Sequence, residues 1–282
     1  MKKILVTGAK GQLGLALQAE ATRFPEFSLI LTDREELDIT DADAIHAFFA
    51  SEEFDAVVNC AAYTAVDKAE TDEETAFLLN FQAALLLAEA AQAKGSRFIQ
   101  VSTDYVFDGR SNRPYTEDQD TSPQSIYGAS KLRGEAAVLG TYPEAVIVRT
   151  SWLYSRHGVN FALRMQELMK EKESLNVVFD QTGTPTYAPD LAAAIFTILS
   201  HPAPEGGVYH YSNEGVASWY DFAVAIRELT GAACKVLPVT SEQYPTAAMR
   251  PAYSVLNKAK IKAAFGLEIP YWKDSLAVCL GK

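Results

Sequence analysis

Three glycines near the N-terminus constrain the fold more than any other feature of the sequence. The segment "ILVTGAKGQLG" places a short run of β-branched residues directly before Gly8, Gly11 and Gly14, and residues 12–24 then have helical periodicity. A tight turn between a strand and a helix brings backbone N–H groups to the helix N-terminus, where a pyrophosphate can bind. The segment therefore predicts a dinucleotide-binding unit, although a structural turn without a ligand would show the same three glycines.

The first half of the chain continues this strand–helix alternation. We expect strands at 3–8, 28–33, 55–62, 97–102 and 145–151, and helices at 12–24, 41–52, 71–95 and 125–140. Near-continuous apolar strands separated by helices indicate a parallel sheet that is covered on both faces. Residues 1–151 are therefore predicted to form a dinucleotide-binding domain of the α/β class, with a doubly wound parallel (Rossmann-like) sheet.

The pattern becomes less regular from residue 152, where glycine and proline punctuate the sequence. Helices are expected at 159–172, 189–200, 218–230 and 271–280, with short strands near 176–179, 207–211 and 235–238. We interpret residues 152–282 mainly as a smaller, irregular α/β lobe that binds substrate. The pattern leaves open whether some of its segments return to the first domain.

The charge and the cysteines narrow the class of protein. A net charge of −11 repels phosphate backbones, so no nucleic-acid partner is expected, while a small phosphorylated ligand needs only local donors. The three widely spaced cysteines suit free thiols in a reducing compartment. The apolar run of "MKKILVTG" is too short for a signal peptide, and no segment is expected to span a membrane. These features predict a cytoplasmic protein.

The end of the second strand bears on the choice of cofactor. Asp33 can accept a hydrogen bond from an adenosine ribose 2′-hydroxyl, whereas Arg34 can hold a 2′-phosphate, so the choice between NADH and NADPH stays open. Asp38 faces the adenine or is a solvated loop residue. The small residues Ala61 and Ala62 follow the third strand and would let a cofactor lie close to the backbone, with Tyr63 next to them. The charges at 67–70 otherwise suit an exposed helix start.

Three further residues predict acid–base chemistry at the same edge of the sheet. Thr103 follows the fourth strand, and Tyr127 and Lys131 are four apart on the next helix, so their side chains share one face. An ammonium close to a phenol lowers the phenol pKa toward the working pH, and a threonine hydroxyl can bond the same carbonyl oxygen. Without the surrounding fold, an exposed helix pair would explain Tyr127 and Lys131 equally well.

With these residues placed, the chain resembles the extended short-chain dehydrogenase/reductase family, and within it the dTDP-4-dehydrorhamnose reductases. The resemblance covers nearly the whole chain. It is carried by "GAKGQLG", "NCAAYTAVDKAE", "STDYVFDG", "YGASKLRGE", "RTSWLY", "GVNF", "DQTGTPT" and "RPAYSVLN". It implies that NADPH or NADH reduces the C4 keto group of dTDP-4-dehydro-L-rhamnose to give dTDP-L-rhamnose.

The resemblance also implies roles for individual residues. Thr103, Tyr127 and Lys131 match the catalytic residues. The positions that match cofactor contacts are Gly11, Gln12, Leu13, Asp38, Ile39, Ala61, Ala62 and Tyr63. Asp104 and Trp152 match contacts to the sugar, although Trp152 also suits a core position just past a strand. Asn160 and Arg250 are candidates for the nucleotide diphosphate.

The same fold is compatible with two other activities and with a non-catalytic role. A nucleotide-sugar 4,6-dehydratase would carry a glutamate after the Thr-Asp pair, where this chain has Tyr105, a poor base. An epimerase or a cofactor-binding regulatory subunit without turnover could also be built on this fold. Relatives that hold magnesium between subunits carry acidic residues where this chain has Ala16 and Pro189, with Asp190 adjacent. We therefore expect no metal, and either a monomer or a metal-free homodimer.

Overall fold

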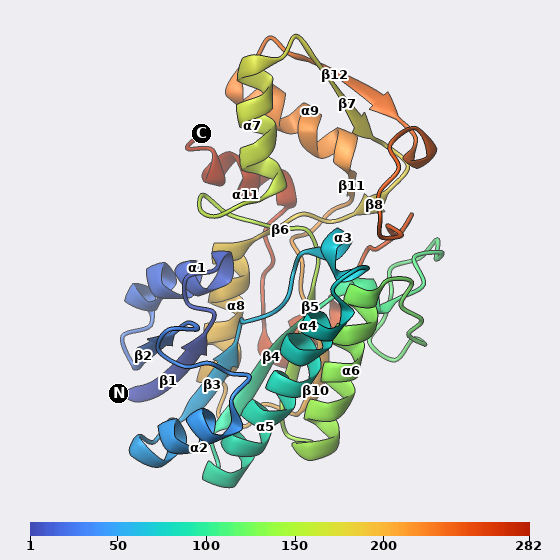
Figure 1. Ribbon diagram of the computed structural model, residues 1–282. Helices are drawn as coiled ribbons and strands as arrows, with labels where there is room; N and C mark the ends of the chain where they lie inside the picture. The colour runs from blue at the N-terminus through green and yellow to red at the C-terminus, as the bar shows by residue number, and fades with distance from the viewer.

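A six-stranded parallel sheet forms the centre of the computed structural model, which describes residues 1–282 (Figure 1). The strand order is β10-β5-β4-β3-β1-β2. The strands are β1 (Lys2–Thr7), β2 (Phe27–Thr32), β3 (Ala56–Asn59), β4 (Arg97–Thr103), β5 (Val146–Thr150) and β10 (Gly207–His210). Every neighbouring pair is parallel, so all six strands end at the same edge of the sheet. The predicted fold class is confirmed.

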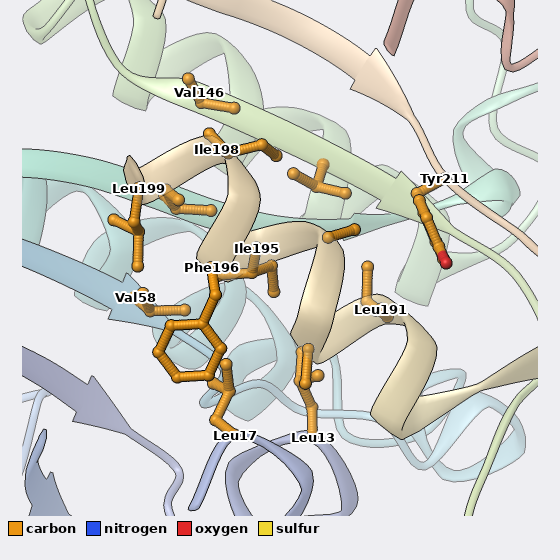
Figure 2. Close-up of a cluster of buried hydrophobic side chains, with 14 of the residues drawn as sticks. Leu13, Leu17, Val58, Val146, Leu191, Ile195, Phe196, Ile198, Leu199 and Tyr211 are labelled. Carbon is orange, nitrogen blue, oxygen red and sulfur yellow. The ribbon is translucent and has the colours of Figure 1, made fainter. Parts of the chain in front are cut away.

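Helices cover both faces of this sheet because its strands are apolar on both sides. Along β1, Ile4 and Val6 face one layer of helices, while Leu5 faces the other. The first layer contains α1 (Gln12–Glu20), α8 (Ala188–Ser200) and α10 (Ala259–Phe265), and Figure 2 shows the side chains of α1 and α8 meeting those of the strands. The second contains α2 (Ala42–Ser51), α5 (Ala83–Lys94) and α6 (Ile126–Thr141).

The predicted helix over 71–95 is divided into three parts. They are α4 (Glu73–Phe77), a π-helical turn η2 (Leu78–Gln82) and α5, which ends at Gly95 with a φ of +68°. The expectation that no segment could span a membrane is wrong on length and composition, since the 22-residue helical segment Glu73–Lys94 is long and apolar enough to cross one. In the fold, α5 packs Ala84, Leu87 and Ala88 into the core beneath the sheet. This is the position of a core helix.

A smaller lobe lies beyond the carboxyl ends of the strands (Figure 1). Two parallel strands, β7 (Ser174–Val178) and β12 (Lys235–Val239), pack with α7 (Phe161–Glu171), α9 (Trp219–Thr230) and α11 (Trp272–Cys279) around their own apolar core. Two short ladders lie between the lobe and the sheet. They pair β6 (Leu153–Tyr154) with β9 (Thr186–Tyr187), and β8 (Thr182–Gly183) with β11 (Ala217–Ser218).

Three parts of the second half lie with the main sheet, a possibility that the sequence left open. The strand expected at 207–211 in the smaller lobe is β10, which pairs with β5 from Gly207↔Val146 to His210↔Arg149 and extends the main sheet. The helix α8 belongs to the same layer as α1. The helix α10 was not predicted. These segments return to the sheet after the chain has already contributed α7 and β7 to the lobe.

The remaining short elements lie in the connections. They are the 3₁₀ turns η1 (Ala21–Arg23), η3 (Asp104–Val106) and η4 (Ser241–Gln243), and the one-turn helix α3 (Val66–Ala69). The helix expected from residue 41 is α2, and Asp41 caps it, since its carboxylate accepts hydrogen bonds from the backbone N–H groups of Asp43 and Ala44. Of these connections, η3 and α3 lie beside the site described next.

Candidate functional site

A cleft of about 920 Å³ opens at the carboxyl ends of the sheet strands and extends to the smaller lobe. Most of the residues predicted from the sequence line it. They are Gly8, Gly11, Gln12, Leu13, Gly14, Asp33, Arg34, Asp38, Ile39, Ala61, Ala62, Thr103, Asp104, Tyr127, Lys131, Trp152 and Arg250. The fold thus brings side chains from positions 8 to 250 to one site.

The glycine turn at the start of α1 is too tightly packed for side chains. Gly8 has a φ of +63°, and a Cβ atom there would lie 2.7 Å from the backbone nitrogen of Ala61. A Cβ on Gly14 would lie 2.5 Å from the carbonyl oxygen of Gly8. Gly11 is the N-cap of α1 and has no side chain to occupy the helix N-terminus. The first-turn N–H groups are therefore accessible to an anion from the cleft.

Charged residues surround the turn after β2. The Asp33 carboxylate accepts hydrogen bonds from the backbone N–H of Lys10 (3.2 Å) and that of Arg34 (2.9 Å). The Arg34 side chain is exposed and lies 3.5 Å from the carboxylate of Asp38. Lys10, which the sequence analysis did not single out, forms a 2.8 Å ion pair with Glu35 and also lines the cleft. Acidic and basic side chains are thus both present where the cleft meets the turn after β2.

Thr103, Tyr127 and Lys131 meet at the centre of the cleft. Thr103 is the last residue of β4, while Ser125 caps α6 and so starts the helix that carries Tyr127 and Lys131. All three side chains are at least nine-tenths buried. The Lys131 ammonium donates a 2.7 Å hydrogen bond to the carbonyl oxygen of Val101. The buried ammonium is thereby fixed to the backbone of β4.

The titration of these groups differs from the sequence expectation. Burial lowers the pKa of Lys131 to about 8, and the negative charge of Glu135 opposes this. Burial also raises the pKa of Tyr127 well above its usual value, with the nearby Thr103 hydroxyl opposing and the Asp104 charge adding to the rise. The net shift of the Tyr127 pKa is therefore upward and not downward as expected, because burial is its largest cause. Tyr127 is held as a neutral phenol, which can donate a proton.

Asp104 and Ser102 leave polar atoms without partners at the same place. Asp104 is buried, and burial raises its carboxyl pKa to about 6. One carboxylate oxygen accepts a hydrogen bond from the Thr103 hydroxyl at 3.0 Å, while the other makes no hydrogen bond of normal geometry, although the Ser254 hydroxyl lies close enough to lower the Asp104 pKa. The buried Ser102 hydroxyl, which was not predicted, also has no hydrogen-bond partner. Unpartnered buried polar groups are costly, so these atoms indicate a polar ligand in the cleft.

Two tryptophans line the cleft where it meets the smaller lobe. Trp152 follows β5 and has a φ of +48°, the only positive value outside glycine. Its ring is stacked on that of Trp219, with centroids 3.6 Å apart and planes 10° apart. Trp219 was not predicted as a site residue, because an aromatic residue at the start of an amphipathic helix is ordinarily a core residue.

Arg250 crosses the cleft from the smaller lobe to the sheet domain. Its guanidinium donates a hydrogen bond to the Tyr105 hydroxyl (3.0 Å) and forms an ion pair with Asp67 on α3. The other Asp67 oxygen accepts from the backbone N–H of Ala248 (3.0 Å). The ring of Tyr105 packs edge-on against that of Tyr127, with centroids 5.5 Å apart. Asp67, expected to be a solvated charge, therefore has a specific partner.

Two predicted residues do not line the cleft. Asn160 caps α7, where its amide oxygen accepts from the N–H of Leu163 and its NH₂ group donates to Gln12 (2.9 Å). Asn160 is thus occupied in holding the loop before α7. The Tyr63 hydroxyl donates to Asp72 at 3.0 Å, and its backbone N–H donates to the side-chain oxygen of Asn80. Both residues support the walls of the site from behind.

The residues considered for a metal are engaged otherwise. The carboxylate of Asp190 accepts hydrogen bonds from the amide of Asn213 (2.7 Å) and the hydroxyl of Ser275 (2.5 Å), which ties α8 to α11. Ala16 is buried in the first core layer. The structure contains no group of three or more His, Cys, Asp or Glu side chains placed to hold a metal ion.

The whole chain matches one known family. The sequence model of the RmlD substrate binding domain matches residues 1–282. The chain belongs to the RmlD substrate binding domain family. One member, a dTDP-4-dehydrorhamnose reductase from Sinorhizobium fredii, is 42% identical over 282 residues, which is 97% of this chain and 95% of that protein.

Solved structures of this family share the fold throughout. A dTDP-4-dehydrorhamnose reductase from Clostridium acetobutylicum has a TM-score of 0.95 and 43% identity, covering 99% of this chain and 98% of that one. The dTDP-4-dehydrorhamnose reductase of Bacillus anthracis, solved in complex with NADP, also has a TM-score of 0.95, with 38% identity and the same coverage. The cleft described above thus lies in a fold that carries NADP in the Bacillus protein.

Proposed function

We propose that this chain is an NAD(P)H-dependent reductase that converts dTDP-4-dehydro-L-rhamnose to dTDP-L-rhamnose by reducing its C4 keto group. The observation that carries the proposal is the meeting of Thr103, Tyr127 and Lys131 in a cleft that begins at a glycine-rich helix N-terminus. The volume of that cleft suits a dinucleotide and a sugar side by side. The membership of the RmlD family supports the same chemistry.

The cofactor site fits NADPH or NADH. Gly8, Gly11 and Gly14 leave the first turn of α1 open to the pyrophosphate, and Gln12 and Leu13 line the cleft beside them. Asp33, Arg34, Asp38 and Ile39 would hold the adenosine end, and the small residues Ala61 and Ala62 would lie between the two ends of the cofactor. When bound, the reduced nicotinamide supplies the hydride for the reaction.

The protein would supply the proton and the orientation. Tyr127, kept neutral by burial, donates its phenolic proton to the oxygen at C4 as negative charge develops there. The Thr103 hydroxyl, which donates to Asp104 in the absence of substrate, would turn to donate a hydrogen bond to the same oxygen and orient the carbonyl. Lys131, fixed by Val101, holds the ribose next to the nicotinamide and favours the phenolate that remains on Tyr127.

The substrate would extend from this centre toward the smaller lobe. The unpartnered oxygen of Asp104 accepts a hydrogen bond from a sugar hydroxyl, and Trp152 forms a wall of the sugar pocket. Arg250 is positioned to meet the diphosphate at the mouth of the cleft. Asn160 acts indirectly, because it holds the loop that borders Gln12.

The decisive experiment is a turnover assay with defined nucleotide sugars. Purified protein is mixed with NADPH or NADH and with dTDP-4-dehydro-L-rhamnose, and loss of the reduced nicotinamide absorbance is followed alongside the product by NMR. We expect a sugar reduced at C4, formed in equal amount to the oxidised cofactor. Cofactor binding without turnover would favour a regulatory subunit, while a product epimerised or dehydrated without net cofactor loss would favour an epimerase or a dehydratase. Either result would contradict the proposal.

The proposal extends to the organisation and the setting of the molecule. Residues 1–151, joined by α8 and β10, form the dinucleotide-binding domain, and the rest of 152–282 forms mainly the substrate lobe. The protein acts in the cytoplasm as a monomer or a metal-free homodimer, without a nucleic-acid or membrane partner. The net charge of −11 supports the absence of nucleic acid, because an acidic surface repels a phosphate backbone.

A further inference from the structure

Trp152 holds a backbone conformation that its side chain disfavours. Its φ of +48° lies in the left-handed region, where a bulky residue is strained. Such a conformation persists only when the surroundings determine it, and it is found preferentially at functional sites. The backbone carbonyl oxygen of Trp152 accepts a 3.1 Å hydrogen bond from the N–H of Thr186, and the hydroxyl of the preceding Ser151 donates to the carbonyl oxygen of Thr184. The strained segment is thus fixed on its backbone side.

The ring of Trp152 is fixed by the smaller lobe. Trp219 stacks on it at 3.6 Å, and Phe161 packs against Trp219 at a centroid distance of 4.7 Å. Trp219 itself is placed by a capping box, in which the Ser218 hydroxyl and the Asp221 carboxylate close the first turn of α9. The stack is therefore held on a helix end and not on a mobile loop.

Gly183 limits the ring from a second direction. A Cβ atom at this position would lie 2.7 Å from Cε2 and 2.8 Å from Cζ2 of Trp152, so only glycine leaves room for the indole. Gly183 pairs with Ala217 across the β8–β11 ladder, directly before Ser218 and Trp219. One ladder therefore fixes both groups that contact the Trp152 ring.

We propose that Trp219 is a positioning residue which, with Gly183, holds the ring of Trp152 in place as a wall of the sugar pocket. This inference rests on the proposed function for the identity of the ligand. Trp219 stabilises the strained conformation of Trp152, so that the wall is preformed before the sugar arrives. A preformed wall saves the entropy of ordering a large side chain on binding. Trp219 acts on the sugar through Trp152.

Spectroscopy tests the stack without any substrate. The chain has three tryptophans, so Trp272→Phe leaves only Trp152 and Trp219. Two stacked indoles give an exciton couplet in the far-ultraviolet circular dichroism. We expect the couplet in Trp272→Phe and its loss when Trp219→Leu or Gly183→Ala is added. If neither Trp219→Leu nor Gly183→Ala changed the couplet, the proposal that these two residues hold the Trp152 ring would be overturned, whatever reaction the protein catalyses.

Kinetics test the positioning role. We expect Trp219→Leu to raise the KM for the dTDP keto sugar about 3- to 10-fold, the range for loss of one aromatic pair. The dissociation constant of NADPH should change by less than about twofold, because the stack lies away from the glycine turn. Trp219→Phe keeps a ring for stacking and should restore most of the sugar affinity. An equal loss for sugar and cofactor would contradict the inference and indicate general disruption of the lobe.

A double-variant cycle separates positioning from direct contact. Trp219 itself lines the cleft, so it could also touch the ligand. If it acts through Trp152, adding Trp219→Leu to Trp152→Leu should change the sugar KM by less than about twofold. Additive effects would overturn the positioning role. The matched control is Trp272→Phe. Trp272 lies in the core of the same lobe, its indole nitrogen has no hydrogen-bond partner, and it does not line the cleft. This substitution should leave the sugar KM unchanged.

Discussion

Removing the charge of Glu135 should both destabilise the fold and shift the pH dependence of activity. Glu135 lies on α6, four residues after Lys131, and forms a buried ion pair with Arg149 of β5, with contacts of 2.7, 2.9 and 3.1 Å. Both side chains are 4% exposed. His210 also lies beside Arg149, but burial lowers its pKa to about 3, so it is neutral and offers no counter-charge. The substitution Glu135→Gln removes the carboxylate that is paired with the guanidinium, and leaves only the charge of Glu117, which forms no ion pair with it.

The expected size of the effect follows from this burial. Breaking a buried ion pair on one side costs about 3–5 kcal/mol of unfolding free energy. For a chain of 282 residues, that corresponds to a fall of about 5–8 °C in Tm. Differential scanning calorimetry measures it, and Glu135→Gln with Arg149→Met should recover part of the loss because no charge is then left unpaired. A Tm within about 2 °C of the unsubstituted protein would refute the reasoning.

Activity provides a second, independent readout of Glu135. Burial lowers the pKa of Lys131 to about 8, and the negative charge of Glu135 limits this fall. In Glu135→Gln the Lys131 pKa falls further, so the ammonium is lost at lower pH. The alkaline limb of kcat/KM, expected near pH 8 as Lys131 loses its proton, should therefore move to lower pH. If the alkaline limb of kcat/KM stayed at the same pH in Glu135→Gln, the charge of Glu135 would not control the pKa of Lys131.

Three further predictions test the site. Tyr127→Phe should lower kcat about 10²–10⁴-fold with little change in cofactor affinity, since only the proton donor is lost, and more than about a tenth of the original rate would remove Tyr127 from that role. Arg34→Ala should weaken NADPH more than NADH and Asp33→Ala the reverse, as measured by titration, and equal losses would exclude both residues from cofactor discrimination. Full activity and an unchanged mass by light scattering are expected in EDTA, because Asp190 is already bonded to Asn213 and Ser275; a loss restored by magnesium would contradict this.

The sequence predicted the parts of the molecule that depend on local patterns. The strands β1 to β5 are short apolar runs with turn residues at their ends. Asp41 marks a helix start through its carboxylate, and Gly95 marks a helix end through its positive φ. Because parallel strands share one edge, the positions of Thr103 and of Tyr127 in the cleft also followed from the pattern. For these residues, neighbours within a few positions determine the structure.

Contacts between distant residues were not predictable in this way. The strand β10 is as short and apolar as strands of the smaller lobe, and only its pairing with β5 decides which sheet it joins. The partners Asp67 and Arg250 are 183 positions apart. Trp219 comes to Trp152 only through the β8–β11 ladder. The direction of the Tyr127 pKa shift was missed for the same reason, since burial depends on the complete fold.

The position of β10 has a consequence for how the chain is made. Until residue 210 has left the ribosome, β5 is an edge strand whose outer row of hydrogen-bonding groups has no partner. A fragment ending at residue 151 would keep that exposed edge permanently, and it would also lack α8, which covers one face of the sheet. Such a fragment is expected to self-associate through β5. The division into two parts therefore describes function. Folding of the sheet domain is expected to need most of the polypeptide, because both halves of the sequence contribute strands and helices to it.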